Sequence, residues 1–259
     1  MKLSIVTPSF NGRAYLEPTA RALLSQEGAF ELEWLVVDGG STDGTLEFLR
    51  SLKDDRVHWL SEADRGQSHA INKGLALAAG DVVTWLNTDD LYVAGTLAAV
   101  AAAFESNPSA QWVTGRCDII GPGGGVIRPG VTRYKERSLR RYSYRALLRE
   151  NFISQPAVFW RREFGNRIGP LDESLHYTMD YDLWLRMGRE SPPLFVDRVL
   201  AQFRVHETSK SGRVDRGQFD EQYRVACRYV GRDRISRWAH RFNVEKIVWA
   251  YRVMRVLGV

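Results

Sequence analysis

Short apolar runs and longer amphipathic segments alternate over the first 112 residues of the chain. The apolar runs have the length and the β-branched or aromatic content of strands, and the amphipathic segments repeat their apolar residues at helical spacing. Strands that alternate with helices in this way are joined as βαβ units, so the pattern predicts a mostly parallel central sheet with flanking helices. The strand-like runs are residues 3–7, 34–37, 57–60 and 82–86, and the helix-like segments are residues 14–26, 45–52, 68–79 and 93–104.

The pattern changes after Asn107-Pro108. A longer strand-like run is followed by a glycine-rich stretch that is typical of a hairpin turn, and helical periodicity dominates the end of the chain. We therefore expect a first half over residues 1–112, a second half over 113–212 and a helical extension over 213–259. The expected elements are strands at 112–120, 126–127, 157–160 and 194–205, a short helix within 133–149, and helices at 181–189 and from 216 onward.

Composition narrows the class of protein. Hydrophobic residues make up 44% of the chain and charged residues 26%, which excludes wholesale disorder. Two cysteines, Cys117 and Cys227, are too few for a disulfide framework or a cysteine metal cluster, and we expect both to be inert core residues. No apolar run approaches the ~18 residues of a membrane-spanning helix, and the N-terminus lacks the organisation of a signal peptide. These features predict a cytoplasmic location.

The formal net charge of +5 conceals a split between the halves. Residues 1–112 carry 8 basic and 15 acidic side chains, whereas residues 113–259 carry 28 basic and 16 acidic ones. One hypothesis is that the first half handles a cation and the second half an anionic partner. The alternative is that arginines decorate solvated surfaces, and charge alone favours this alternative.

Polar segments follow each of the first four predicted strands. Because ligands bind beyond the carboxyl ends of parallel strands, we expect the four segments to meet at one edge of the sheet. Helix capping explains any single one of them, but it is a poorer explanation for four in succession. The segments are Thr7-Pro8-Ser9-Phe10-Asn11, Asp38-Gly39-Gly40-Ser41-Thr42-Asp43-Gly44, Asp64-Arg65-Gly66-Gln67-Ser68 and Asn87-Thr88-Asp89-Asp90.

The adjacent pair Asp89-Asp90 is the sharpest of these signals. Two carboxylates at a buried strand end repel each other unless a cation lies between them, and hard divalent cations prefer oxygen ligands. The alternative is a solvated turn that caps a helix starting near Val93, and the pair alone does not decide between the two. The chain has neither a G-x-G-x-x-G fingerprint after its first strand nor a P-loop, which argues against a dehydrogenase and an ordinary NTPase.

Taken together, these segments resemble the family 2 inverting glycosyltransferases, which have the GT-A fold. The likeness covers about residues 1–212. It extends to Gln155-Pro156, to Leu171-Asp172-Glu173, to the run from Met179 to Arg186, and to Phe203-Arg204-Val205-His206-Glu207-Thr208-Ser209. The resemblance implies an α/β GT-A domain with a Rossmann-like nucleotide-binding half (1–112), an acceptor-binding and catalytic half (113–212), and the helical extension.

The resemblance also implies roles for individual residues on the donor side. Asp38 should accept a hydrogen bond from the base, most simply from the N3–H of the uracil or thymine of a UDP- or dTDP-sugar. A divalent cation, Mn²⁺ or Mg²⁺, should be held by Asp90, with His206 as a further contact to the metal or the diphosphate. Thr7, Pro8 and Asn11 should line the base and ribose pocket, Asp64 and Arg65 should lie beside the base, ribose and phosphates, and Asp89 should approach the ribose or the donor sugar.

On the acceptor side, the resemblance makes Asp180 the general base. Met179 departs from the family pattern, because a glutamate often occupies that position. Gln155 matches the acceptor-side segment, while Asp172 and Glu173 could equally hold the acceptor or cap a turn. Asp182 should point away from Asp180, since it follows two residues later on a helix, and Trp184 and Leu185 should lie in the core.

The basic second half suggests an anionic partner. Residues 133–149 mix seven basic residues with three tyrosines, which suits either nucleic acid or an anionic membrane interface, and lipid-linked acceptors in the family favour the membrane. In the C-terminal helix one apolar face carries Trp238, Phe242, Trp249, Val253 and Val256, flanked by Arg237, Arg241, Lys246, Arg252 and Arg255. This face predicts peripheral binding to the inner face of the cytoplasmic membrane, with packing on the domain or on a second copy as the alternative.

The sequence therefore predicts metal-assisted, inverting transfer of a sugar from a nucleotide donor to a hydroxyl of a lipid-linked or polysaccharide acceptor. A non-catalytic nucleotide-sugar-binding or regulatory module of the same fold is the alternative. A sugar nucleotidyltransferase would need a glycine-rich, basic loop after the first strand, and Ser9-Phe10-Asn11-Gly12 does not supply one.

Overall fold

The computed structural model describes residues 1–207, 209 and 216–257, with side chains described up to residue 249. Thr208, the expected boundary at 212/213, and the side chains of Arg252, Val253, Arg255 and Val256 lie outside this part. The strands, in chain order, are β1 (Lys2–Ser9), β2 (Glu31–Asp38), β3 (Val57–Ser61), β4 (Val82–Trp85), β5 (Leu91–Tyr92), β6 (Trp112–Ile120), β7 (Val126–Ile127), β8 (Val158–Arg161) and β9 (Leu194–Arg204).

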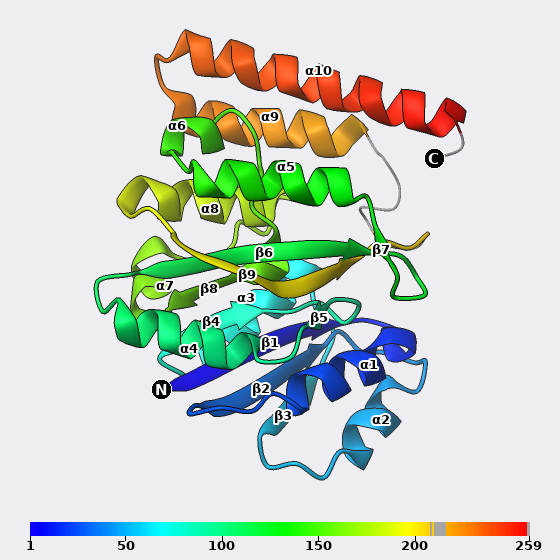
Figure 1. The fold of residues 1–259 in the computed structure, drawn as a ribbon. Helices are drawn as coiled ribbons and strands as arrows, with labels where there is room; N and C mark the ends of the chain where they lie inside the picture. Colours follow the sequence, from blue (N-terminus) through cyan, green and yellow to red (C-terminus); the bar gives the residue numbers. More distant parts are fainter. Residues whose placement is uncertain (208, 210–215, 258–259) are drawn as a thin grey trace.

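Helices flank the sheet, and those of the C-terminal half stack into successive layers above it (Figure 1). The helices of the first half are α1 (Arg13–Leu24), α2 (Thr45–Ser51), α3 (Gln67–Leu77) and α4 (Thr96–Ser106). Those of the second half are α5 (Pro129–Arg140), α6 (Tyr144–Leu147), the 3₁₀ turn η1 (Gln155–Ala157), α7 (Arg162–Ile168), α8 (Met179–Glu190), α9 (Arg216–Val230) and α10 (Arg234–Leu257).

The described strands form one sheet in the order β3-β2-β1-β4-β8-β6-β9-β5, with β7 paired to β6. The first four strands run parallel, as the alternating pattern predicts, and their register sets Ser9 beside Asp38 and Asp38 beside Ser61. Their carboxyl ends therefore share one edge. Beyond β4 the sheet becomes mixed: β8 is antiparallel to both β4 and β6, whereas β9 is parallel to β6. This curled α/β arrangement with helices on its faces agrees with the expected fold class.

One local prediction is confirmed and another changes. The predicted hairpin at residues 121–127 is confirmed, because β7 pairs antiparallel with β6. The helix expected from Val93 begins instead at Thr96, since residues 91–92 pair with β9 and the Val93 N–H donates to the Leu200 carbonyl (3.2 Å). Gly95 is the N-cap of α4, so Asp89 and Asp90 do not cap this helix. The capping alternative for the acidic pair is therefore removed.

Four buried tryptophans fix α8 against the sheet. Trp184 of α8 stacks on Trp85 of β4 at a centroid distance of 5.8 Å and on Trp112 of β6 at 6.0 Å, and Trp160 meets it edge-on at 6.2 Å. Trp184 and Leu185 are fully buried, which confirms that they are core residues. Because aromatic pairs at these distances are favourable and directional, they set the rotation of α8 and hence the position of its first turn.

The C-terminal extension is tied to the start of α8. Glu221 of α9 is buried and accepts hydrogen bonds from the backbone N–H groups of His176, Tyr177 and Thr178 at 3.1, 2.8 and 2.8 Å. The Thr178 hydroxyl donates to the same carboxylate at 2.9 Å. Thr178 is the N-cap residue of α8, and its side chain makes no capping bond to the helix. Glu221 of the C-terminal extension therefore orders the segment that leads into α8.

Candidate active site

Asp38, at the end of β2, lies beneath the strand-end loops. Its side chain is fully buried, and it accepts hydrogen bonds from the Gly40 and Ser41 N–H groups (3.0 and 2.9 Å) and from the hydroxyls of Ser41 and Ser61. Three of these bonds end on Oδ2 and one on Oδ1, so the Asp38 carboxylate holds the loop in place while Oδ1 keeps an acceptor position. The expected hydrogen bond from the base of the donor to Asp38 stays a prediction.

Asn11 links this loop to the first strand. Its backbone N–H donates to Ser41 Oγ (2.7 Å), and its side-chain oxygen accepts from the Thr42 N–H (2.9 Å). Asn11 has a φ of 50°, a left-handed conformation that asparagine tolerates better than most residues. The loops after β1 and β2 therefore form one hydrogen-bonded unit, and Asn11 acts at least in part by holding that unit together.

Thr7 and Pro8 form the floor of this edge. Both are buried, and the Thr7 hydroxyl accepts a hydrogen bond from Trp34 Nε1 at 2.9 Å. The exposed residue of the segment is Phe10, with 67% of its surface accessible. Sequence reasoning quoted Phe10 but gave it no role. Phe10 could have been identified from the sequence, because a large aromatic residue in a turn after a strand does not contribute to the core.

Asp64 lies directly above Gly39. Its Oδ1 accepts from the Gly66 N–H at 2.7 Å, and its Oδ2 lies 2.7 Å from the point that a Cβ at residue 39 would occupy. That point is also 3.3 Å from Cδ2 of Phe10. Because Gly39 has no side chain, the half-buried carboxylate of Asp64 can lie next to the exposed ring of Phe10, at the edge where the parallel strands end.

Arg65 and Glu173 connect the two halves of the chain. Arg65 donates to Glu173 Oε2 at 2.7 Å, and this bond lowers the pKa of the glutamate. Asn72 donates to the other carboxylate oxygen at 3.3 Å. Asp172 is engaged differently: it accepts from Ser174 within its own turn and from Arg228 of α9 at 2.8 Å. Of the two alternatives left open for this pair, the geometry favours turn capping for Asp172.

Asp90, after β4, is a fully buried carboxyl. Its Oδ1 accepts from the Arg204 backbone N–H and its Oδ2 from the Asn87 side chain, both at 3.0 Å. Burial, and then the negative charge of Asp89, raise the pKa of Asp90 well above its usual range. Asp90 therefore joins the end of β4 to the end of β9, and both of its oxygens have protein partners.

Asp89 is the member of the pair that faces the site. Its Oδ2 lies 3.0 Å from Nε2 of His206, and the two side chains keep 22% and 11% of their surface accessible. The His206 ring stacks on Tyr15 of α1 at 4.6 Å, and the Arg204 guanidinium lies over the Tyr15 ring, 5.5 Å from its centroid. A carboxylate and an imidazole from opposite halves of the chain thus meet at the strand edge.

These donors suit a divalent cation. Asp89 contributes a carboxylate and His206 an imidazole, and a cation that binds a diphosphate takes its remaining ligands from phosphate oxygens and water. The described residues contain no cluster of three or more His, Cys, Asp or Glu side chains placed to hold a metal ion. Asp89 is the more accessible carboxylate, with 22% of its side chain exposed, whereas Asp90 is fully buried. The expected assignment of the metal to Asp90 and of the donor sugar to Asp89 stays a prediction.

Asn87 is the centre of a polar network next to this pair. Its side chain accepts from Gln67 Nε2 at 2.8 Å and donates to Asp90 and to Gln155, the latter at 3.4 Å. Gln155 donates in turn to the carbonyl of Trp85 at 2.7 Å. The predicted acceptor-side residue Gln155 therefore contacts the end of β4, beside the residues predicted to bind the donor.

Asp180 lies in the first turn of α8 with a raised pKa. Burial raises the pKa of its carboxyl to about 6, although the Tyr181 N–H (2.7 Å), the charge of Lys135 and the side chain of Asn151 all favour the ionised form. Met179, where a glutamate was expected, is buried in the core instead. Asp182 is buried and pairs with Arg186 at 2.9 Å, which confirms a structural role.

Lys135 is a neighbour of Asp180 that sequence reasoning missed. The sequence groups it with the other basic residues of 133–149, but its ammonium donates to Ser154 Oγ at 3.2 Å, and burial lowers its pKa. Its charge acts on Asp180 and on the buried thiol of Cys117, whose pKa burial raises to about 12. A lysine on the inner side of an otherwise exposed basic helix was not distinguishable from its neighbours by composition.

Replacing Lys135 by Met is expected to move the acid limb of the pH profile. Asp180 must be ionised to act as a base, so activity should fall as the pH drops through about 6. Removal of the Lys135 charge raises the pKa of Asp180 further and shifts this limb to higher pH, by about one pH unit. The profile of kcat/KM against pH measures it. Arg137→Met, an exposed change on the same helix, is the control, and an unmoved limb in Lys135→Met would contradict the coupling.

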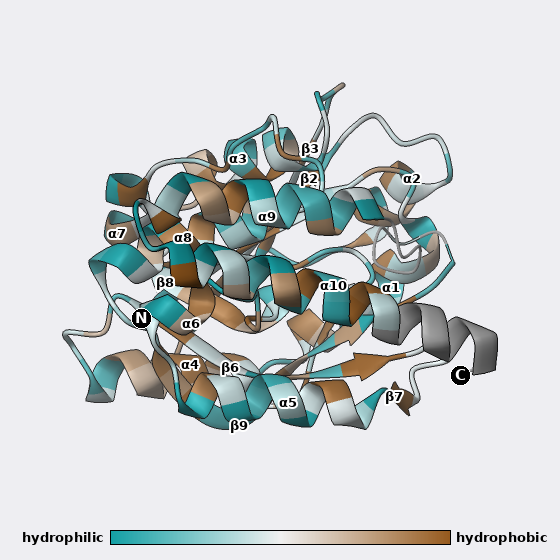
Figure 2. Cartoon of the chain, turned by 90° about the horizontal axis from the view of Figure 1, so that it is seen from above, coloured by the Kyte–Doolittle hydropathy of each residue, from teal (hydrophilic) through white to brown (hydrophobic). Residues whose placement is uncertain are grey.

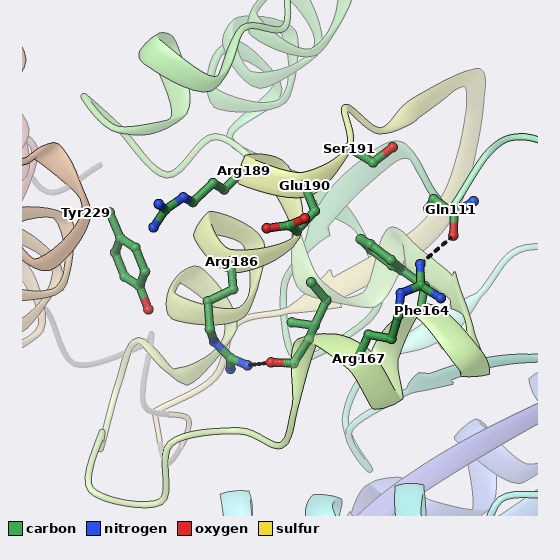
Figure 3. Close-up of a pocket in the computed structure, with 9 residues that line it drawn as sticks. Gln111, Phe164, Arg167, Arg186, Arg189, Glu190, Ser191 and Tyr229 are labelled. Atoms are coloured by element: carbon green, nitrogen blue, oxygen red, sulfur yellow. Dashed lines mark hydrogen bonds between the residues drawn. The ribbon is translucent and has the colours of Figure 1, made fainter.

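A separate hollow of about 470 Å³ lies at the other end of α8 (Figure 3). Its lining comes from the second half of α8, from α7, from Gln111 just before β6 and from Tyr229 of α9. Arg186 donates there to the Ile168 carbonyl and Arg167 to Gln111. None of the residues predicted to act on the donor or the acceptor lines it. The strand edge, and not this hollow, is the candidate active site.

The sequence profile described as glycosyl transferase family 2 matches residues 4–166, a range that contains the ends of all four parallel strands and Gln155. The chain belongs to this family. This glycosyltransferase is 30% identical over 201 residues to a PGL/p-HBAD biosynthesis glycosyltransferase of Mycobacterium bovis, covering 76% of this chain and 73% of that protein. An uncharacterized glycosyltransferase of Mycobacterium tuberculosis is 26% identical over 204 residues, or 78% of this chain and 74% of the other.

Solved structures show the same fold. S. aureus TarS 1–349 in complex with UDP-GlcNAc superposes with a TM-score of 0.66 at 19% identity, over 89% of this chain and 67% of that one. The mannosyltransferase PcManGT of Pyrobaculum calidifontis, in complex with GDP-Man and Mn²⁺, gives a TM-score of 0.68 at 21% identity, over 87% and 64%. This glycosyltransferase spans 40% of the longer TarS chain. At these identities the likeness establishes the GT-A fold.

Proposed function

We propose that this glycosyltransferase moves a sugar from a nucleoside-diphosphate sugar to a hydroxyl acceptor, with inversion and with the help of a divalent cation. The observation that carries the proposal is the meeting of Asp89 and His206, 3.0 Å apart, at the edge where the parallel strands end. The Asp180 carboxyl, with a pKa of about 6, supplies the second requirement, a base that is ionised near neutral pH.

The base of the donor fits between Phe10 and Asp64. An exposed aromatic ring offers a stacking surface, and the Asp64 carboxylate beside it offers a hydrogen-bond acceptor. An acceptor of this kind pairs with the N3–H of uracil or thymine, which favours UDP- or dTDP-sugars. In this proposal Asp64 takes the contact expected of Asp38, while Asp38, Asn11, Thr7 and Pro8 shape the pocket from below.

Asp89 and His206 would hold the cation. A bound Mn²⁺ or Mg²⁺ supplies Lewis-acid stabilisation of the negative charge on the leaving diphosphate. Asp90 and Asn87 keep Asp89 in place through their bonds to Arg204 and to each other. The Arg204 guanidinium donates to the Asp89 carbonyl at 3.0 Å, so the segment that carries Asp89 is held from both sides.

Asp180 would take the proton of the acceptor hydroxyl. The acceptor oxygen forms a bond to the anomeric carbon while the bond from that carbon to the β-phosphate oxygen breaks, and the proton passes to the Asp180 carboxylate. A single displacement of this kind inverts the anomeric configuration. Lys135 favours the ionised carboxylate, while burial keeps it basic enough to accept a proton.

The acceptor would approach from the side of Gln155 and Glu173. Gln155 contacts the end of β4 through Trp85, and Glu173 is joined to the donor-side residue Arg65. Both residues therefore lie where the two substrates would meet. Glycan intermediates, including lipid-linked ones, offer the hydroxyl and hydrogen-bonding groups that such residues recognise, and Asp172 stays a structural residue in this account.

The place of Asp64 can be tested through Gly39→Ala. Gly39 has no positive φ, so alanine suits its backbone, but the new Cβ would lie 2.7 Å from Asp64 Oδ2 and push the carboxylate aside. The affinity for the donor should fall about tenfold, the cost of a lost hydrogen bond to a charged group. Calorimetric titration with a UDP-sugar and Mn²⁺ measures it. Gly130→Ala, which meets nothing within 4 Å, is the control; equal affinities would remove Asp64 from the base pocket.

The proposed activity is tested with a panel of UDP-, dTDP- and GDP-sugars in the presence of Mn²⁺. Release of the nucleoside diphosphate should occur with one donor class and stop when a chelator is added. The competing hypothesis is a nucleotide-sugar-binding module without catalysis, which would show a donor-dependent rise in melting temperature but no release with any acceptor. Binding without release across the panel would favour that module.

A further inference from the structure

The outer face of α10 carries a stripe of exposed apolar side chains. Ile235, Trp238, Phe242 and Trp249 keep 64%, 69%, 56% and 67% of their surface accessible, and their spacing of three, four and seven residues places them on one side of the helix. We call these four residues the aromatic stripe. Figure 1 shows α10 as the outermost layer of the C-terminal half, and Figure 2, which views the molecule from that side, shows hydrophobic and hydrophilic residues alternating along it.

The inner face of α10 accounts for its packing without the stripe. Ser236, His240, Val244 and Val248 are buried, and His240 Nδ1 lies 3.0 Å from the Leu148 carbonyl. These residues fall on the side of the helix opposite the stripe. The helix therefore packs on the domain through its inner face. Packing on the domain, which was the alternative to membrane binding, accounts for the inner face but not for the exposed stripe. Two tryptophans and a phenylalanine are left facing outward.

Basic residues lie on the same helix as the stripe. Arg234 and Arg241 are exposed at one edge of the stripe, whereas Arg237 is exposed farther round the helix and donates to the Gly231 carbonyl at 3.3 Å. None of the three forms an ion pair with a carboxylate within residues 1–207, 209 and 216–249. The one acidic neighbour on this part of the helix, Glu245, is already paired with Arg216 at 3.4 Å. A surface that complements this face must offer an apolar layer for the stripe and negative charges for the arginines.

We propose that the aromatic stripe docks α10 onto the interface of an anionic lipid bilayer. Indole rings partition to the depth of the headgroups, and arginines beside an apolar face reach the lipid phosphates. A second copy of the chain fits less well, because a two-fold interface along the stripe would bring the same arginines of both copies together. Within the residues described, no helix is long and apolar enough to cross a bilayer, so the stripe would lie in the interface plane.

The location of the stripe links the bilayer to the acceptor half. α10 packs on α9, and Glu221 of α9 holds the segment that leads into Asp180. If the proposed function holds, an acceptor carried on a lipid would reach the half of the enzyme that contains the base. Binding of the protein to vesicles does not depend on this step, so the docking surface and the transfer activity can fail separately.

Vesicle flotation with the full chain tests the proposal. The wild-type protein should float with vesicles of phosphatidylcholine and phosphatidylglycerol and stay behind with phosphatidylcholine alone. The triple variant Trp238→Ala, Phe242→Ala, Trp249→Ala should lose about tenfold in partitioning to the anionic vesicles, because most of the buried apolar area is gone. The variant Arg234→Gln, Arg237→Gln, Arg241→Gln should lose a similar factor, and its loss should shrink as salt is raised.

Matched controls separate docking from folding. Trp59→Ala with Leu77→Ala removes exposed apolar side chains from the first half, and this variant should float like the wild type. All variants should keep the wild-type melting temperature and release of nucleoside diphosphate from a soluble donor. Absence of wild-type flotation on anionic vesicles would overturn the proposal. So would unchanged flotation of the aromatic variant, or a dimer that the aromatic substitutions dissociate while vesicle binding persists.

Discussion

Asp180→Asn is expected to lower turnover by about 10²–10⁴-fold while the affinity for the nucleotide-sugar donor stays at the wild-type value. The amide is similar in shape to the carboxylate but cannot accept the proton of the acceptor hydroxyl. Donor binding should persist, because the groups assigned to it lie at the ends of β1 to β4 and of β9, and not on α8. Steady-state rates of nucleoside diphosphate release, with donor affinity measured separately by calorimetry, provide the test.

Asp182→Asn is the matched control for this experiment. Asp182 lies on the same helix two residues later and is held by Arg186 and by the Tyr229 hydroxyl at 2.6 Å. Its loss should lower the melting temperature and leave turnover within a few-fold of wild type. Asp180→Asn should keep the melting temperature and lose turnover, since burial already disfavours the ionised form of Asp180. A parallel fall of donor affinity and turnover in Asp180→Asn would contradict the assignment of this residue as the base.

Asp89→Ala should abolish the stimulation by Mn²⁺ and lower turnover by at least about a hundredfold, equivalent to several kcal/mol of lost transition-state stabilisation. Unlike Asp180→Asn, this variant should also bind the donor more weakly, because the cation that Asp89 would hold also ligates the diphosphate. The measurement is a titration of turnover with Mn²⁺ at saturating donor, followed by a donor titration at saturating Mn²⁺.

Asp55→Ala, an exposed aspartate ahead of β3, is the control for the loss of one negative charge from the same half of the chain. Its dependence on Mn²⁺ should match that of the wild type. An Asp89→Ala protein with an unchanged Mn²⁺ requirement and unchanged turnover would refute the role given to Asp89. It would return the cation to Asp90, whose oxygens are held by Arg204 and Asn87 in the structure.

Periodicity predicted the first half of the fold well because three of its strands, β1, β2 and β4, are buried on both faces. β1 and β4 are almost entirely buried, so their sequences read as continuous apolar runs, and the segments between them have helical spacing. The start of α4 could not be read in this way. Residues 91–92 are taken by a long-range pairing with β9, and no local pattern reports a partner more than a hundred residues away.

The sequence predicted which segments form the candidate site, but it predicted the roles of individual residues less well. Motif order placed Asp64, Asp89 and His206 correctly at one edge. It could not show that Asp38 accepts four internal hydrogen bonds or that Asp90 accepts one from the Arg204 backbone, because both contacts depend on the tertiary structure. The role of Lys135 could not be predicted for the same reason. Several basic residues share its helix, and only the structure shows that Lys135 is on the side that packs against the domain.

The anomeric configuration of the transferred sugar tests the central claim most directly. If one carboxylate, Asp180, activates the acceptor hydroxyl for a single displacement, an α-configured donor must yield a β-glycoside. Proton NMR of the product formed with the donor and acceptor found in the panel reads this configuration from the coupling constant of the anomeric proton. With wild-type protein we expect the anomeric configuration opposite to that of the donor, which is a β-glycoside from an α-configured donor, and far slower product formation with Asp180→Asn. A product that keeps the configuration of the donor would contradict the account.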